Sequence, residues 1–118
     1  MLLVKTHVGK STIHGLGLFA AEDIPPDTMI WEYSIHIDGL ISITDMNLLP
    51  EVARNHVKKA GWVYDVDYWV LLGDDARFIN HSDNPNTYTT RDLGPVRASR
   101  MIRSGEELLE DYKVYGKF

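Results

Sequence analysis

The stretch that decides the fold is Arg77-Phe78-Ile79-Asn80-His81-Ser82-Asp83-Asn84-Pro85-Asn86, in which two apolar residues run directly into seven polar or turn-forming ones. This order has neither the period of an amphipathic helix nor the alternation of a half-buried strand. Asn, Asp, Ser and Pro each favour turns for local reasons, so a solvated turn is the simplest interpretation. Because loop sequences drift unless a ligand or an unusual chain crossing constrains them, the stretch is also a candidate binding loop.

Other chemistries use residues of the same kinds. A weak calcium loop would draw on Asp74, Asp75, Asp83 and Asn84, but the spacing of an EF-hand is absent. The adjacent serine and histidine of the stretch lack the G-x-S-x-G motif of a serine hydrolase, and adjacency alone does not make the histidine a base. The histidines at positions 7, 14, 36, 56 and 81 show no paired spacing, so we predict no metal site.

Length and composition indicate one globular domain over residues 1–118. Hydrophobic residues make up 44% of the chain and charged residues 25%, which is ordinary for a folded domain. No apolar run approaches the ~20 residues that a membrane-spanning helix needs. The start of the chain also lacks the pattern of a signal peptide, so we expect an intracellular protein with no membrane partner.

Net charge and cysteine content limit the classes of binding partner and metal site that the chain could have. The formal net charge of -5 argues against direct nucleic-acid binding, which needs a concentrated basic patch. A mildly acidic body suits a basic peptide partner. Because the chain contains no cysteine, disulfides and thiolate metal sites are excluded.

Short segments rich in β-branched and aromatic residues predict a mainly β fold. One helix is expected over Glu51–Ala60, with Pro50 before it, lysines in its last turn and Gly61 after it. The expected strands cover residues 2–8, 18–21, 29–35, 37–43, 62–67, 68–72, 87–91, 96–101 and 107–109.

The segment Gly15-Leu16-Gly17-Leu18-Phe19-Ala20 matches the G-x-G-x-x-A pattern of a dinucleotide-binding turn. Such a turn must open a helix, whereas Pro25 and Pro26 follow here and favour the end of a strand. The simplest interpretation of the two glycines is therefore a tight turn between strands. Glycine also lets a backbone approach a ligand closely.

Near the end of the chain stands Gly105-Glu106-Glu107-Leu108-Leu109-Glu110-Asp111-Tyr112. Together with His14-Gly15-Leu16-Gly17 and the polar stretch, it resembles the signature of the SET-domain protein lysine methyltransferases, over about Lys5 to Tyr112. The resemblance implies a SET-domain (β-clip-like) fold: several short strands in small sheets, one short helix and a knot-like C-terminal crossing. The small, cysteine-free chain is similar to a minimal viral or bacterial member, which would act in the cytoplasm or, if viral, in the host nucleus.

The function implied by this resemblance is methyl transfer from S-adenosyl-L-methionine to the side-chain amine of a lysine in a protein or peptide, histones included. It implies a catalytic role for Tyr112. The residues implied for the cofactor are His14, Gly15, Leu16, Gly17, Trp62, Arg77, Phe78, Asn80 and His81. Those implied for the channel of the substrate lysine are Tyr33, Tyr64 and Glu110.

The chain departs from the family pattern at several positions. Asp83 stands where cysteine is usual, and Glu110 stands where Phe or Tyr is usual. The tail lacks a zinc-bound segment, so Tyr115 or Phe118 would cover the adenine, or a second subunit of a homodimer would complete the site. The alternative function is a catalytically weak SET-like module that binds a peptide or partner protein.

Overall fold

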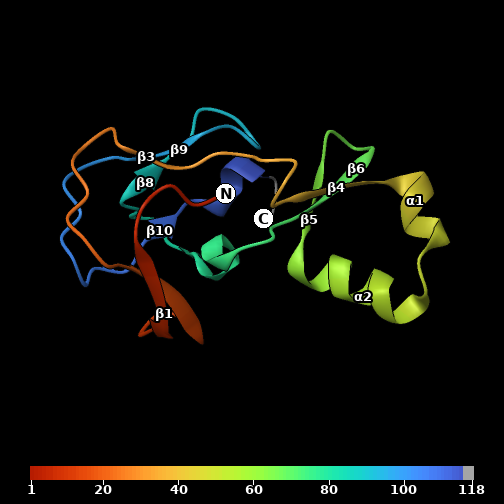
Figure 1. Cartoon of the computed structure of the whole chain (residues 1–118), viewed down its shortest axis with the longest axis horizontal. Coiled ribbons are helices and arrows are strands. Elements are labelled where there is room, and N and C mark those ends of the chain that lie inside the picture. Colours follow the sequence, from red (N-terminus) through yellow and green to blue (C-terminus); the bar gives the residue numbers. More distant parts are fainter. Residues whose placement is uncertain (116–118) are drawn as a thin grey trace.

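The computed structural model describes residues 1–115, whose short strands form several small sheets (Figure 1). Strand β1 (Thr6–Lys10) pairs antiparallel with β2 (Leu16–Ala20). The connection between them and the start of β2, residues 11–17, form what we call the glycine loop. A second antiparallel sheet has the order β3-β9-β8 and comprises β3 (Met29–Trp31), β8 (Thr87–Tyr88) and β9 (Val96–Ala98). The strands expected over residues 87–91 and 96–101 thus contain an antiparallel pair, β8 and β9, joined through residues 92–95.

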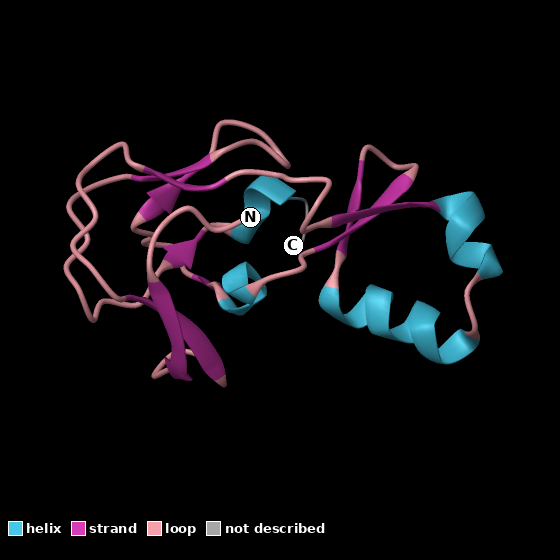
Figure 2. Cartoon of the chain, viewed as in Figure 1, coloured by secondary structure: helices cyan, strands magenta, loops and turns pink. Residues whose placement is uncertain are grey.

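A lobe projects from one end of the molecule (Figure 2). Its sheet has the order β4-β6-β5 and contains β4 (Gly39–Ser42), β5 (Trp62–Tyr64) and β6 (Tyr68–Leu71). Two helices connect β4 to β5, namely α1 (Ile43–Leu48) and α2 (Glu51–Ala60). The bounds predicted for α2 are confirmed, whereas α1 was not predicted.

Two segments that are far apart in sequence cross beside the main core. Strand β7 (Asn80–His81) follows the 3-10 helix η1 (Asp75–Phe78) and pairs in parallel with β10 (Leu109–Glu110), which leads into the 3-10 helix η2 (Tyr112–Tyr115). Just beyond the pair, the backbone N–H of Ser82 donates to the carbonyl oxygen of Glu110 at 2.9 Å. This pairing is the predicted C-terminal crossing.

The main hydrophobic core lies among β2, β3, β9 and η1. Its buried members are Leu18, Ala20, Ile24, Ile30, Trp31, Ala76, Ile79, Val96, Ala98, Ile102 and Leu108. A smaller cluster of Trp62, Val70 and Tyr115 joins the lobe to η2. The expected mainly β fold is confirmed. Most strands are shorter than the ranges that were predicted for them from the sequence. For example, the chain leaves β3 after Trp31, and the Ser34 N–H donates to the buried carboxylate of Asp38 at 3.0 Å.

Candidate active site

A cleft of about 760 Å³ lies over the polar stretch, within the ~300–1,000 Å³ typical of small-molecule sites. It is lined by residues of the glycine loop, α2, η1, β7 and η2, namely Ile13, His14, Gly15, Leu16, Lys59, Arg77, Phe78, Asn80, His81 and Tyr112. The structure thus brings together eight residues that the sequence singled out. Ile13 and Lys59 were missed, because an exposed loop isoleucine and a lysine at a helix C-terminus carry no distinctive signal.

Asn80 fastens the glycine loop to the floor of this cleft. Its Nδ2 lies 3.0 Å from the carbonyl oxygen of His14, 3.1 Å from that of Leu16 and 3.0 Å from Oε2 of Glu107. With Nδ2 used by these three acceptors, Oδ1 is the side-chain atom of Asn80 that can accept a hydrogen bond from a ligand. The buried position of Asn80 keeps this amide in one orientation.

Glu107 connects the three sequence motifs behind the cleft. Its carboxylate accepts hydrogen bonds from Oγ of Ser11, at 2.8 and 2.9 Å, and from Nδ2 of Asn80. A Cβ at Gly17 would lie only 2.5 Å from Oε2 of Glu107. Gly17 therefore faces Glu107 and is absent from the lining of the cleft. This network was not predicted, because Glu107 was assigned only to a short strand and to the C-terminal motif, without a role at the site.

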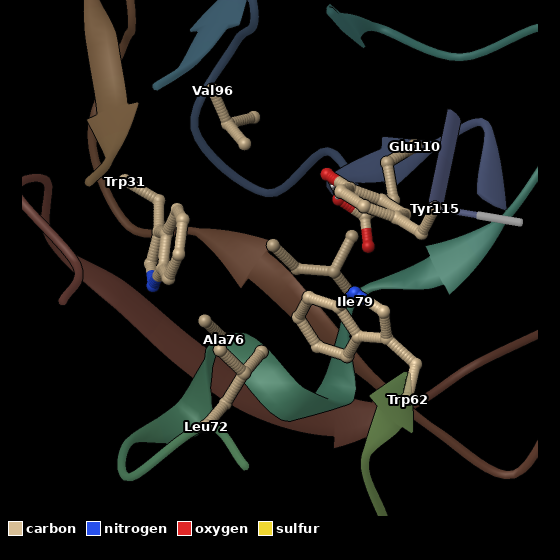
Figure 3. Close-up of a pocket in the computed structure, with 8 residues that line it drawn as sticks. All are labelled: Trp31, Trp62, Leu72, Ala76, Ile79, Val96, Glu110 and Tyr115. Carbon is tan, nitrogen blue, oxygen red and sulfur yellow. Dashed lines mark hydrogen bonds between the residues drawn. The ribbon is translucent and has the colours of Figure 1, made fainter. Parts of the chain in front are cut away.

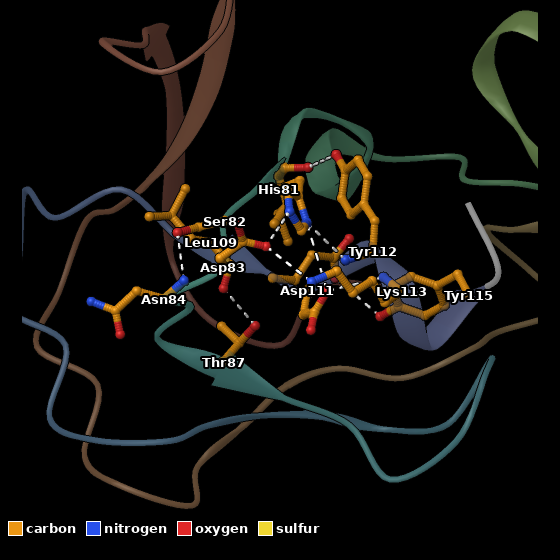
Figure 4. Close-up of polar contacts among 12 residues, drawn as sticks. His81, Ser82, Asp83, Asn84, Thr87, Leu109, Asp111, Tyr112, Lys113 and Tyr115 are labelled. Carbon is orange, nitrogen blue, oxygen red and sulfur yellow. Dashed lines mark hydrogen bonds and ion pairs between the residues drawn. The ribbon is translucent and has the colours of Figure 1, made fainter. Parts of the chain in front are cut away.

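His81 and Tyr112 lie side by side where the two crossing segments meet (Figure 4). The backbone N–H of Tyr112 donates to Nδ1 of His81 at 3.1 Å, and the two ring centroids are 5.4 Å apart. Because Nδ1 accepts, the proton of the neutral ring is on Nε2, which lies 3.2 Å from Oδ1 of Asp83. The Tyr112 hydroxyl donates to the carbonyl oxygen of Ile79.

The Tyr112 hydroxyl is protonated at neutral pH. Burial, together with the nearby negative charge of Glu110, raises the pKa of Tyr112 to about 12. The group therefore acts as a hydrogen-bond donor to Ile79 while its oxygen can still accept from another group.

Asp83, which replaces the usual cysteine, belongs to an exposed charged pair. Its Oδ1 lies 3.2 Å from Nζ of Lys113. The hydrogen bond from Lys113 is the main reason that the pKa of Asp83 is lowered. The ion pair links the two crossing segments, but exposed ion pairs of this kind contribute little to stability.

Ile79 is part of the lining of a second pocket (Figure 3). It is mostly apolar and is lined by Trp31, Trp62, Leu72, Ala76, Ile79, Val96, Glu110 and Tyr115. Ile79 lines this pocket, while its carbonyl oxygen accepts from Tyr112, which lines the cleft. We call this second cavity the aromatic pocket. The cleft and the aromatic pocket share no lining residue, and the hydrogen bond between Tyr112 and Ile79 links one to the other.

Glu110 places a carboxylate in the aromatic pocket. The Tyr115 hydroxyl donates to its Oε2 at 3.0 Å, and the Tyr115 ring lies 5.3 Å from that of Trp62, tilted by 52°. Trp62 in turn donates from Nε1 to Oδ1 of Asp92 at 3.0 Å. Burial, with Glu110 adding to the effect, strongly raises the pKa of the Tyr115 hydroxyl, which stays protonated.

Several predicted site residues lie outside the cleft. Trp62, expected beside the cofactor, lines the aromatic pocket instead, together with Glu110. Tyr33 packs against the main core, and Tyr64 packs against the cluster of Trp62, Val70 and Tyr115. Neither tyrosine is in the lining of the cleft or of the aromatic pocket. Phe118, a candidate cover for the adenine, is outside the described residues.

Two kinds of feature are absent from residues 1–115. No group of three or more His, Cys, Asp and Glu side chains within this range is arranged to hold a metal ion. No helix within it is both long and apolar enough to cross a bilayer.

The family model described as SET domain matches residues 15–113. The chain is 36% identical over 118 residues to the Drosophila melanogaster protein "Histone-lysine N-methyltransferase trr", covering 91% of this chain and 5% of that protein. It is 35% identical over 121 residues to the Schizosaccharomyces pombe protein "Histone-lysine N-methyltransferase, H3 lysine-4 specific", covering 91% and 12%. The chain thus spans a small part of the length of these curated relatives.

Solved structures show the same likeness. A humanized mutant of the Chaetomium thermophilum Polycomb Repressive Complex 2, bound to the inhibitor GSK126, matches with a TM-score of 0.69 and 28% identity, over 95% of this chain and 15% of that one. The structure named "ctPRC2 in an autoinhibited conformation bound to S-adenosylmethionine" matches with a TM-score of 0.68 and 26% identity, over 96% and 16%.

Proposed function

Because this chain belongs to the SET domain family, we propose that it transfers a methyl group from S-adenosyl-L-methionine to the side-chain amine of a lysine in a protein. The observation that carries the proposal is that the hydrogen bond between Tyr112 and Ile79 links two cavities, one a cleft suited to a small molecule and the other a narrow aromatic pocket. Histones are the first substrates to test, since the relatives are named for them.

The cleft fits the proposed cofactor on three grounds. Gly15 leaves open space where a side chain would stand, since a Cβ built there meets no atom within 4 Å. Oδ1 of Asn80 can accept from the ammonium group of the methionine portion, while Arg77 and Lys59 supply positive charge for its carboxylate. Backbone groups at His81 and the Phe78 ring would face the adenine. When bound, S-adenosylmethionine supplies an electrophilic methyl group on a sulfonium centre.

The aromatic pocket bears on the main chemical obstacle to methyl transfer, which is that the lysine side chain is positively charged at neutral pH. At its ordinary pKa of about 10.4, only roughly one lysine in a few thousand is neutral at pH 7. The aromatic pocket has about 20 Å³ of free space in this structure, so its walls would have to move apart to admit an ammonium group. Once inside, the group would lose most of its hydration, which lowers its pKa and favours the nucleophilic amine.

Tyr112 is the proposed catalytic residue. Its hydroxyl is held by the Ile79 carbonyl, so the phenol oxygen has one preferred direction where the two cavities are linked. From there it can accept an N–H of the neutral amine and orient the nitrogen lone pair along the line of attack. The methyl group would also make weak C–H···O contacts to the oxygens of the Tyr112 hydroxyl and the Ile79 carbonyl, which would stabilise it during the transfer.

A second candidate function is a module that binds a peptide or partner protein and transfers few methyl groups. The observation in its favour is the Glu110 carboxylate in the aromatic pocket, because a nearby negative charge stabilises the ammonium form of lysine. Binding would then be strong while the reactive neutral amine stays rare.

Cofactor binding and methyl transfer, measured separately, distinguish these functions. S-adenosylmethionine is titrated into the protein by calorimetry, and tritium transfer to histones and to total-lysate proteins is then assayed. Binding with transfer supports the enzyme, whereas binding without transfer favours the module. Absence of both contradicts the enzyme. Sedimentation of the same samples tests whether a homodimer forms, as one of the alternatives for completing the site requires.

Replacing the proposed catalytic tyrosine gives a sharper test. Tyr112→Phe should lower kcat by roughly 100-fold, because the amine loses its orienting oxygen. The affinity for S-adenosylmethionine should change little, because the ring against His81 remains. Tyr68→Phe, at an exposed tyrosine in β6, is the matched control and should keep full activity. Full activity of Tyr112→Phe would remove Tyr112 from the proposed role.

A further inference from the structure

A further hollow of about 530 Å³ adjoins the cleft at the C-terminal half of α2. The residues that line it are His56, Lys59, Ala60, Gly61, Arg77, Phe78 and Tyr112. Lys59, Arg77, Phe78 and Tyr112 also line the cleft, so the two cavities share one boundary. We call this second cavity the basic hollow.

The charge of this region is one-sided. Among residues 1–115, no aspartate or glutamate lines the basic hollow or the cleft. Lys59 and Arg77 also have no ion pair within that part of the chain, whereas Nη2 of Arg100 lies 2.9 Å from a carboxylate oxygen of Glu106. A chain of net charge -5 thus keeps two cations without a neighbouring carboxylate around one concave surface, where they can attract an anion.

Two local features direct these side chains toward the same space. His56 and Lys59 are three positions apart in α2 and so lie on one face of the helix, while Lys58 between them lines neither cavity. The guanidinium carbon of Arg77 lies 4.8 Å from the centre of the Phe78 ring, which lines both cavities. Cationic groups from α2 and η1 therefore face one volume.

This volume extends beyond what the proposed cofactor needs. Its methionine portion carries a single carboxylate, which Lys59 and Arg77 can serve at the shared boundary. His56, Ala60 and Gly61 line the basic hollow alone, so space and an N–H donor continue past that boundary. Phosphate suits this set, because a guanidinium and an ammonium both bind its oxygens and imidazole donates an N–H in either protonation state.

We propose that the basic hollow binds a chain of phosphate groups, either of an adenine nucleotide or of an inorganic polyphosphate. A nucleotide would place its adenosine portion in the cleft, as the proposed cofactor does, and would therefore compete with S-adenosylmethionine. This competition rests on the proposed function, whereas phosphate binding in the basic hollow does not.

Three ligands test the proposal: adenosine, ATP and tripolyphosphate, each titrated by calorimetry into the intact protein without divalent metal. ATP should bind at least about tenfold more tightly than adenosine, as expected for charge-assisted hydrogen bonds, and should displace S-adenosylmethionine. Tripolyphosphate should also bind, and rising salt should weaken the binding of both anions. Equal affinities of ATP and tripolyphosphate, with no displacement of S-adenosylmethionine, would support the site and identify inorganic polyphosphate as its ligand.

Matched variants locate the site. Lys59→Gln should weaken the binding of ATP and tripolyphosphate by about tenfold, since one charge-assisted contact is lost. Lys58→Gln removes the same charge from the neighbouring position and should stay within about twofold of wild type. His56→Gln should weaken ATP binding about threefold but leave the affinity for S-adenosylmethionine unchanged, because His56 does not line the cleft. His36→Gln, at an exposed position in another loop, is its control.

Two results would overturn the proposal. One is ATP that binds no more tightly than adenosine, together with no binding of tripolyphosphate. The other is an equal loss of affinity in Lys58→Gln and Lys59→Gln, which would indicate diffuse attraction to the surface of α2. Either result can occur while methyl transfer remains intact. Phosphate binding that depends on Lys59, without any binding of S-adenosylmethionine, would instead reject the proposed enzyme and leave the basic hollow as an anion site.

Discussion

At the scale of single residues, Gly15, in the loop before β2, and Gly17, within β2, are required for different physical reasons. Gly15 has a φ of +47°, in the left-handed region that side chains with a Cβ rarely adopt, and the space around it is open. Gly17 faces the side chains of Glu107 and Ser11, and a Cβ there would lie 3.1 Å from Cβ of Ser11. Glycine is therefore needed at position 15 for its backbone conformation, and at position 17 because the Glu107 and Ser11 side chains approach the backbone closely.

Substitutions separate these two requirements. Gly15→Ala should lose about 1 kcal/mol of stability and Gly15→Asn less, because asparagine tolerates the left-handed conformation. Gly17→Ala should lose about 1–3 kcal/mol, because Glu107 must leave its bonds to Ser11 and Asn80. Urea unfolding measures both effects, and calorimetry should show weaker S-adenosylmethionine binding for Gly17→Ala. Equal stability of Gly17→Ala and the wild type would contradict this account.

The same two positions show what the sequence could and could not predict about the site. His14, Gly15, Asn80, His81 and Tyr112 lie in unusual local patterns, and the structure gathers all of them in the cleft. Lys59 has no such pattern, because a lysine in a last helical turn is ordinary, and Glu107 belongs to the C-terminal motif but had no site role predicted for it. Their roles depend on residues distant in sequence, which no local pattern contains.

At the scale of elements, helix α1 is the clearest difference from the sequence-based prediction. The isoleucines at 37, 41 and 43 favour a strand by composition, and β4 does occupy residues 39–42 of the expected 37–43. The strand ends at Ser42, whose hydroxyl accepts the N–H of Asp45 at 3.0 Å and caps the helix. The order Ser-x-x-Asp is a capping pattern that strand composition obscured.

The cap at Ser42 should determine whether this short helix forms. Ser42→Ala should destabilise the protein by about 1 kcal/mol, since the Asp45 N–H loses its partner. Ser42→Asp keeps an oxygen acceptor at the same position and should stay near wild type. Hydrogen exchange should report faster opening at residues 43–48 in Ser42→Ala only. Equal protection in both variants would show that packing of the buried Met46, and not the cap, holds α1.

At the scale of the whole molecule, the cleft exists because the polar stretch and the C-terminal segment cross. The parallel pair of β7 and β10 is only two residues long in each strand, which is too short for any sequence pattern to announce. Only the family resemblance predicted it. Side chains also hold the C-terminal segment in place. Thr87, for example, donates from Oγ1 to the carbonyl oxygen of Leu109 at 2.8 Å.

Asn86 is the residue whose loss should loosen this crossing most. It is 2% exposed, its Nδ2 donates to the carbonyl oxygen of Glu107 at 2.8 Å, and its Oδ1 accepts the N–H of Leu109 at 2.9 Å. Asn86→Ala leaves both backbone groups unpaired, and a buried group without a partner costs about 1–3 kcal/mol. The free energy of unfolding in urea should therefore fall by roughly 3 kcal/mol.

Two comparison variants make the Asn86 prediction specific. Asn84→Ala, in the same loop but exposed, should change stability by less than about 0.5 kcal/mol. Asn86→Asp should lie between the two, because it keeps the acceptor for Leu109 but turns an oxygen toward the Glu107 carbonyl. Since β10 leads directly into η2, a loosened crossing should also displace Tyr112, so methyl transfer should fall in the same order as stability. If Asn86→Ala were as stable as Asn84→Ala, backbone pairing of β7 with β10 would suffice to hold the crossing.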